Sequence, residues 1–402
     1  MLRTATAGDI TFAQSCHLFP GAFLEELDAT LLVENNKLLN ISQQEHDGLG
    51  IAKDRWFLPT RMGGYGLHSA IVSGPAIFLS SWIRSLPDIA SRNDYTSPAD
   101  LLTSVASLKN VFTEAQDRLS TLGVTRSSSL EEAIEEQPKF QAKRWKAEAY
   151  SRIVTCISSG ARDKDTIAVE ESSGPGVGAW LQFPRAPHHC FTDEEYVVCI
   201  RLRIALPVFA QGVGTHLVCR HTGHETGVCG TTMDEYGTHS LCCKRGGHVV
   251  RRHNAIRDCT GKELGNAGIS HVTVEQTAPD DTMALRPDLC YHDSHSRAVF
   301  LDVEVTTRHV HRNTSSMRAG ALIEQAEAVK KRKYAHLRLL PCIFSHLGRV
   351  GQGMQACIKS SCCDPDLSVR SKYIAGFYQS ISCALQKGNV AILAASGPLI
   401  GP

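Results

Sequence analysis

The stretch Val299–Thr306 reads VFLDVEVT and decides how the second half of the chain folds. Apolar and acidic residues alternate along it, and this alternation is the period of a β-strand. Asp302 and Glu304 therefore point to one face of a sheet, and the aliphatic residues beside them point to the other face, into a core. A weaker alternation at His271–Glu275 predicts a second strand.

Helical periodicity follows these strands. It is found at Ala319–Leu337 and again at Ser371–Gln386, where Gly388 is the expected stop. Strands followed by helices indicate a small α/β domain.

The first 165 residues have the pattern of helices instead. Ser97 and Pro98 supply an N-cap and a first-turn proline, apolar residues then recur at steps of three and four, and Gly123 closes the run. A second helical stretch is predicted at Ser129–Ile157, with a break at Pro138. We interpret both stretches as packing surfaces.

Between the two halves, Glu171–Pro187 is rich in Gly, Ser and Pro, which is typical of a linker. A helix begins after it at Thr192, whose hydroxyl can form a capping box with Glu195. We therefore expect an α+β, multidomain chain that consists of a helical region at 1–165, a linker at 166–191, a helix with a Cys/His-rich segment at 192–247 and an α/β domain at 248–395.

Composition sets the general class of the protein. The 402 residues suggest two or three domains. The 42 Lys and Arg residues against 41 Asp and Glu residues give a net charge of +1, which is too small to attract charged partners toward the whole protein. Fibrous, collagen-like and wholly disordered chains are excluded. No apolar stretch can span a bilayer and no signal peptide is evident, so we expect a soluble chain whose 15 Cys form no disulfide framework.

Cys and His concentrate between residues 219 and 243. Three residues separate His239 from Cys243, so both side chains can reach one ion, and Cys229 can supply a third ligand. Zinc takes four such ligands in a tetrahedron, and the fourth could be Cys219, His221 or His224. The alternative is a Cys/His-rich loop with buried thiols.

A basic segment follows directly. From Leu241 to Arg257 the chain has five Lys or Arg residues and no acidic residue. Such a run is often only a solvated surface, but beside a zinc knuckle it is typical of a patch that grips phosphate. We therefore predict that nucleic acid binds at Lys244, Arg245, Arg251, Arg252, His253, Asn254 and Arg257.

Acidic residues near the strands predict a second metal site. Asp288 follows a proline, and thirteen residues separate it from Asp302 on the predicted strand. Two converging carboxylates can hold Mg²⁺ or Mn²⁺, which phosphodiester hydrolysis needs to activate water and to shield phosphate. Glu275 is a candidate third carboxylate. Lys330 and Lys333 of the following helix either stabilise charge on phosphate or form a solvated face.

In this order, the segments resemble the C-terminal half of the polyprotein of site-specific non-LTR retrotransposons, in the branch that carries a restriction-like endonuclease after its reverse transcriptase. Leu58–Leu67 is similar to the glycine-rich segment that follows the polymerase palm. Cys229, His239 and Cys243 resemble members of the family's Cys-Cys-His-Cys knuckle, and Arg252-His253-Asn254 resembles the basic motif after it. The resemblance spans most of the chain.

Further along, Pro287-Asp288 and Asp302 resemble the PD-(D/E)XK nuclease core, and the C-terminal portion of the family is similar to Lys330–Tyr334, Gly348-Arg349 and Ser380–Val390. The resemblance implies thumb-like helices in the N-terminal half, a small zinc knuckle and a C-terminal mixed-sheet domain of the restriction-endonuclease type. It implies that Asp288 and Asp302 hold Mg²⁺ or Mn²⁺ and that a lysine steadies the transition state. The reaction would be a DNA nick whose 3′-hydroxyl primes reverse transcription. The implied partners are double-stranded target DNA and, as a second candidate, the element's RNA, in the nucleus and away from membranes.

Three departures distinguish this chain from the family pattern. Thr226-Gly227 stands where the knuckle's first Cys is expected, so Cys219 or a nearby His must replace it. Glu304 stands where the nuclease motif has its lysine, so Lys330 or Lys333 is the expected replacement. No Tyr-x-Asp-Asp motif is present, so the polymerase palm is missing and the chain cannot copy nucleic acid by itself.

Two other interpretations come from different classes of protein. A decayed, non-catalytic element would keep its nucleic-acid affinity through the knuckle and the basic segment, and Thr226 and Glu304 favour it. An unrelated helical protein would carry Cys and His only as core residues. Zinc content separates this last class from the first two, and nicking of supercoiled DNA separates those two from each other.

Overall fold

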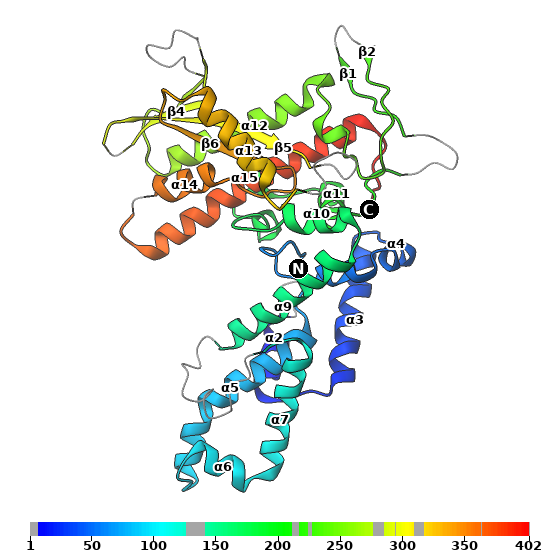
Figure 1. The fold of residues 1–402 in the computed structure, drawn as a ribbon, viewed down its shortest axis with the longest axis vertical. Coiled ribbons are helices and arrows are strands. Elements are labelled where there is room, and N and C mark those ends of the chain that lie inside the picture. The colour runs from blue at the N-terminus through cyan, green and yellow to red at the C-terminus, as the bar shows by residue number, and fades with distance from the viewer. Residues whose placement is uncertain are drawn as a thin grey trace. The chain divides into compact units, whose positions relative to one another are not determined.

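A computed structural model describes residues 7–125, 141–210, 217–223, 227–275, 285–293, 295–308, 317–362 and 364–401. The chain divides into two compact units (Figure 1). Residues 1–59 and 66–161 form the first unit, and residues 60–65 and 162–402 form the second. Among the described residues, none of the helices combines the length and the apolar character that crossing a bilayer requires.

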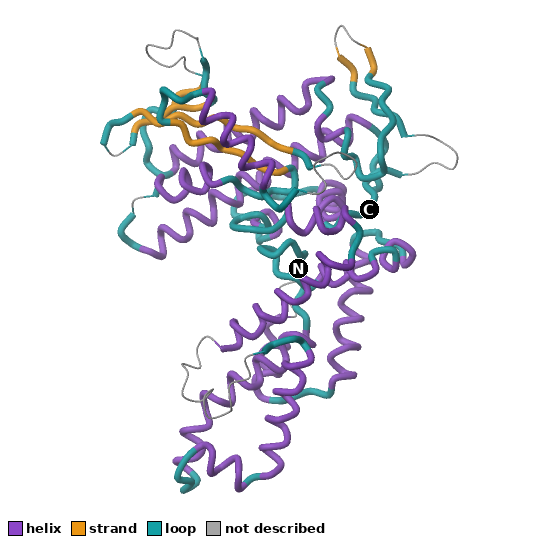
Figure 2. The backbone as a smooth tube through the Cα atoms, in the orientation of Figure 1, coloured by secondary structure: helices purple, strands orange, loops and turns teal. Residues whose placement is uncertain are grey.

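The first unit is helical in its described part (Figure 2). Its helices are α2 (Ala7–Cys16), α3 (Gly21–Leu38), α4 (Gln43–Asp47), η1 (Gly50–Trp56), α5 (Ala70–Arg92), α6 (Pro98–Ser104), α7 (Ala106–Thr121) and α9 (Gln141–Gly160). Helix α5 is central because α2, α3, α7 and α9 all pack against it. Phe78 of α5 and Phe112 of α7 make an edge-to-face pair, with ring centroids 5.8 Å apart.

The helix predicted from Ser97 is present, but it is divided in two. Ser97 Oγ accepts the N–H of Asp100 at 3.1 Å, and Pro98 begins α6 as predicted. Val105, at φ −110° and ψ 84°, then separates α6 from α7 because these angles are not helical. For the second predicted helix, the described residues begin at Gln141, and Pro138 lies outside them.

The second unit combines helices with two small sheets. Its elements are α10 (Asp163–Glu171), η3 (Ala179–Leu181), η4 (Pro187–His189), α11 (Asp193–Arg203), β1 (Thr222–Gly223), β2 (Gly227–Val228), η5 (Ser240–Cys242), η6 (Arg245–Gly247), α12 (His248–Asn266), β3 (Thr273–Val274), β4 (Leu289–His292), β5 (Ala298–Thr306), α13 (Ala321–Lys333), β6 (Leu339–Ser345), α14 (Gln352–Ser361) and α15 (Leu367–Ser396). The Thr192 capping box at the start of α11 is confirmed.

The main sheet of this unit is mixed, with strand order β3-β4-β5-β6. Strands β3, β4 and β5 are antiparallel neighbours, whereas β5 and β6 are parallel and are connected through α13. The alternation predicted for Val299–Thr306 is confirmed. Leu301 and Val303 are buried in the core that α12, α14 and α15 complete, and Phe300 packs in a small cluster on the opposite face.

Residues 166–191 are not a linker, which corrects the expectation from their composition. Helix α10 covers the start of this range, and Val177 and Trp180 are buried. The glycines serve close packing. A Cβ on Gly176 or Gly178 would come within 2.4 Å of Tyr378 or Thr60, so only glycine allows the backbone to approach these side chains.

The prediction that Gly388 ends the last helix is wrong. Helix α15 continues through it to Ser396. A Cβ at Gly388 would lie 2.6 Å from Cγ of Arg252, so this glycine lets α15 pack closely on α12. The strand predicted at His271–Glu275 is shorter than expected, because only Thr273 and Val274 pair with β4.

Candidate metal centre and nuclease pocket

Four metal-binding side chains meet in the second unit. The ligand atoms of Cys219, Cys229, His239 and Cys243 all lie within 4.8 Å of one another. The Sγ atoms of Cys219 and Cys243 are 3.8 Å apart, and Nε2 of His239 lies 3.4 Å from Sγ of Cys229. In a tetrahedral zinc site two sulfurs are about 3.8 Å apart and a sulfur and a nitrogen about 3.6 Å. The cluster could therefore hold a metal ion such as zinc.

Short backbone elements position these ligands. The N–H of Cys219 donates to the carbonyl of Thr231 at 2.9 Å, and the N–H of Gly230 donates back to Cys219 at 3.0 Å. Gly230 has φ 67°, which a side chain would strain, so the turn directly after Cys229 requires glycine. His239 comes immediately before η5 and Cys243 immediately after it, so one helical turn brings both ligands to the same side.

The thiols of the cluster have opposite acidities. Hydrogen bonds from Thr231 lower the pKa of the Cys229 thiol to about 6. Burial, in contrast, raises the pKa of Cys219 to about 12, because a lone thiolate is disfavoured away from water. A cation among the sulfurs would supply the charge that a buried thiolate needs. The donor set could therefore hold a metal ion such as zinc.

The structure also separates the alternatives for the fourth ligand. His221 is buried, and its Nε2 lies 2.9 Å from the carbonyl oxygen of Ile392 in α15, so this histidine ties the segment to α15 instead. His224 lies outside the described residues. Cys219 is thus the fourth member of the described cluster.

A pocket of about 410 Å³ lies beside β5 in the same unit. Its lining residues are Val249, Arg252, His253, Arg286, Asp288, Asp302, Val303, Glu304, Val305, Lys330, Lys333 and Tyr334. The structure thereby brings together Asp288, Asp302 and both candidate lysines.

Asp288 reaches this pocket because β4 is short. Strand β4 begins one residue later and pairs with β5 only as far as Leu301, so Asp288 faces the unpaired edge of β5. There its Oδ2 accepts the N–H of Val303 at 2.5 Å, and its Oδ1 lies 3.0 Å from Nε2 of His253. Burial alone would raise the pKa of Asp288, but the contacts with His253 and Val303 and the charge of Lys330 lower it. Asp288 is therefore held as a carboxylate.

Lys330 is the lysine that contacts the acidic face of β5. Its Nζ lies 2.6 Å from Oδ1 of Asp302 and 3.3 Å from Oε2 of Glu304. Burial would lower the pKa of Lys330, but the bonds and charges of the two carboxylates raise it, so the amine stays protonated. Lys333 lines the same pocket, where its Nζ lies 3.0 Å from the hydroxyl of Tyr334.

Glu275 is not brought into this pocket. Its side chain is 55 % exposed and forms an ion pair with Arg257. Arg257 also lies 2.9 Å from Asp258, so two acids already neutralise this predicted phosphate contact. The structure therefore gives Glu275 no place in the acidic cluster and weakens the assignment of Arg257.

Arg252 also differs from its prediction as a phosphate contact. The side chain is buried, and it donates to Oδ1 of Asn389 at 2.8 Å and to the carbonyl of Leu241 at 3.2 Å. Burial lowers the pKa of Arg252 to about 10. Arg252 thus joins α12 to α15, and the exposed cations of the basic segment are Lys244 and Arg251.

The other members of the segment are partly buried. Arg245 donates to the carbonyl of Val228 at 2.6 Å, and Asn254 is half-buried on α12. His253 turns toward Asp288 rather than outward. Sequence reasoning missed this contact, and it gave no role to Arg286, which is exposed at the pocket. The position of Arg286, two residues before Asp288, was the one local signal for it.

No protein-family model matches the chain, and no curated protein is similar to it at a significant level.

Proposed function

We propose that this chain is the nuclease-bearing part of a non-LTR retrotransposon protein, and that it nicks target DNA in a metal-dependent reaction to prime reverse transcription. The observation that carries the proposal is the meeting of Asp288, Asp302 and Lys330 in one pocket. These residues are distant in sequence, and they are the ones that a phosphodiesterase of this type requires. The nucleus is the location that a genomic DNA target implies.

The carboxylates of the pocket are suited to hold a cation. Both oxygens of Asp288 are oriented by hydrogen bonds, and Asp302 is 5 % exposed, so both side chains are held in place at the pocket. When bound, Mg²⁺ or Mn²⁺ would supply Lewis-acid activation of water and would neutralise charge on phosphate. Lys330 would stabilise the charge that develops on the phosphate oxygens, and Arg286 would orient the DNA backbone.

A decayed, non-catalytic nucleic-acid-binding element is the second candidate, and one contact favours it. Lys330 lies within 2.6 Å of Asp302, so its amine neutralises the carboxylate that would otherwise attract a metal ion. Glu304 occupies the place of the motif lysine and also contacts Lys330. In a decayed element this ion pair would be the permanent state of the pocket.

Nicking of supercoiled plasmid tests the proposal. The full chain should convert plasmid to open circles with Mg²⁺ and should fail when Mg²⁺ is omitted; a chelator is avoided because it would also remove zinc. Asp302→Asn should slow nicking by about a hundredfold or more, while DNA affinity stays unchanged. Glu324→Gln is the matched control, because it removes one exposed carboxylate from α13. Strong DNA binding without nicking under any divalent cation would establish the decayed element instead.

A further inference from the structure

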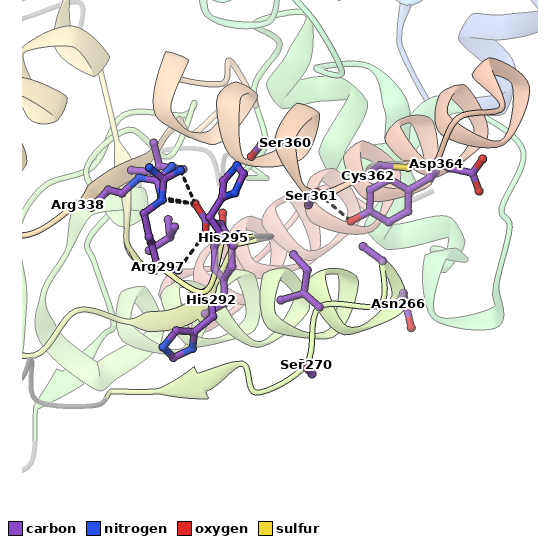
Figure 3. A pocket seen from close by; sticks show the side chains of 18 of the residues that line it. Asn266, Ser270, His292, His295, Arg297, Arg338, Ser360, Ser361, Cys362 and Asp364 are labelled. Atoms are coloured by element: carbon purple, nitrogen blue, oxygen red, sulfur yellow. Dashed lines mark hydrogen bonds and ion pairs between the residues drawn. The ribbon is translucent and has the colours of Figure 1, made fainter.

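A second pocket, of about 730 Å³, lies at the other end of α12 (Figure 3). The tip of the β4–β5 hairpin, the start of β6, and the ends of α12 and α14 line it. Arg297, Arg338 and His295 gather at one end, and Ser361, Cys362 and Asp364 lie at the other (Figure 3). None of its lining residues belongs to the pocket beside β5, which we call the proposed nuclease pocket.

The basic end is preorganised by one carboxylate. Asp293 accepts the backbone N–H groups of His295 at 2.9 Å and of Arg297 at 3.0 Å, which fixes the hairpin turn. The same side chain forms ion pairs with the guanidinium groups of both Arg297 and Arg338. Two guanidinium groups against one carboxylate leave a net positive charge. Each guanidinium has five N–H donors, so donors remain for a further anion.

The remainder of the pocket suits a flat organic group. Tyr291, Val299 and Leu340 provide apolar surface from the sheet, and Tyr373 adds a half-buried ring. The last turns of α12 and α14 lie at the far end. Ser361 adds a hydroxyl, 3.2 Å from that of Tyr373. A ligand here would have an anionic end and a planar body.

We propose that this pocket binds a single unpaired nucleotide, with its phosphate on Arg297 and Arg338 and its base against the tyrosine-lined surface. The volume suits one small organic ligand and not a duplex. The choice of a nucleotide among phosphate compounds rests on the proposed function. His253 and Asn266 place the two pockets on one helix, about 20 Å apart at 1.5 Å per residue. A DNA strand covers that distance in about six nucleotides.

Calorimetric titration of the full chain with deoxyadenosine 5′-monophosphate, without Mg²⁺, tests this proposal. Binding should be tighter than for inorganic phosphate or for deoxyadenosine alone. Arg297→Ala/Arg338→Ala should weaken it by about tenfold or more, because two charge-assisted contacts are lost. Arg92→Ala/Lys109→Ala removes two exposed cations from the first unit and should leave the affinity within about twofold.

If the double alanine variant fails to fold, the variant Arg297→Lys/Arg338→Lys takes its place. It keeps the ion pairs with Asp293 but loses the planar guanidinium groups, so it should also bind the nucleotide more weakly. A single-stranded DNA hexamer should displace the mononucleotide, and an RNA hexamer in a parallel titration shows whether the sugar matters. Equal affinity in the pocket variants, or binding of inorganic phosphate as tight as that of the nucleotide, would overturn the proposal. Nucleotide binding without plasmid nicking would refute the proposed nuclease activity and support the nucleotide site. Nicking without nucleotide binding would support the nuclease activity and refute the nucleotide site.

Discussion

Lys330 links the two acidic residues of β5. Its amine contacts Asp302 and Glu304 in a partly buried setting, where charge interactions are less screened than at the open surface. The ion pairs hold the acidic face of the strand together. They also place a cation where charge on a phosphate would need stabilisation.

Replacement of Lys330 by Gln should therefore lower the initial rate of nicking by about tenfold to a hundredfold. Lys333→Gln should have a smaller effect, since Nζ of Lys333 is directed to Tyr334. Lys331→Gln is the control, because Lys331 is an exposed cation of the same helix. Equal rates for the Lys330 and Lys331 variants would exclude Lys330 as the catalytic lysine.

Two neighbouring arginines should respond in opposite ways to replacement by Ala. Arg252→Ala should lower the free energy of unfolding by about 2–4 kcal/mol, because it leaves Asn389 Oδ1 and the Leu241 carbonyl buried without a donor. Arg251 is exposed, so Arg251→Ala should change stability by no more than about 0.5 kcal/mol and should weaken DNA binding instead. Urea unfolding and DNA titration at fixed salt measure both. A stable Arg252→Ala protein with weakened DNA binding would restore Arg252 as a phosphate contact.

Among the elements, those in the described part of the Cys/His-rich segment, residues 219–243, are short. Strands β1 and β2 have two residues each, and η5 has three. A bound metal ion would help to fix such a segment, and His221 already ties it to α15.

We expect the purified chain to contain about one zinc ion, and Cys229→Ser or Cys243→Ser to lose it. Cys242→Ser is a stringent control, because Cys242 adjoins Cys243 but is not a member of the cluster. Elemental analysis after purification without chelator gives the stoichiometry. A metal-free wild-type chain, or equal metal content in all three variants, would refute the prediction of a zinc knuckle.

The packing of α12 on α15 depends on Gly388. Gly388→Ala should destabilise the protein by about 1–3 kcal/mol, since the added methyl group would meet Arg252. The matched change Gly265→Ala, in α12, meets no atom within 4 Å and should stabilise by about 0.5–1 kcal/mol through helix propensity. Thermal unfolding of the two variants compares them directly. If both variants shifted the unfolding temperature in the same direction, the contact between the helices would not be tight.

Elements with a strong local period could be predicted from the sequence. Strand β5 follows from the alternation at Val299–Thr306, and α11 follows from the Thr192 capping box. The burial of Arg252 and the passage of α15 through Gly388 could not be predicted, because both arise from one long-range helix contact. Three members of the candidate metal cluster, Cys229, His239 and Cys243, were evident from their spacing. The choice of Cys219 needed the backbone pairing of Cys219 with Thr231.

At the scale of the whole molecule, the metal cluster and both pockets belong to the second unit. Helix α15 contacts the Cys/His-rich segment through His221 and α12 through Arg252, while α12 carries His253 to the proposed nuclease pocket. The candidate metal cluster and both pockets thus rest on one set of packed helices. We propose that Asp288 and Asp302 jointly bind a divalent cation.

Equilibrium binding of Mn²⁺, followed by electron paramagnetic resonance, tests that claim most directly. The cysteine-rich cluster prefers softer ions, so it does not compete for Mn²⁺. The wild-type chain should bind Mn²⁺, and Asp288→Asn and Asp302→Asn should each weaken binding by at least about tenfold, whereas Glu324→Gln should not change it. Failure of the wild-type chain to bind Mn²⁺, or equal binding by all four proteins, would contradict a shared metal site at these carboxylates.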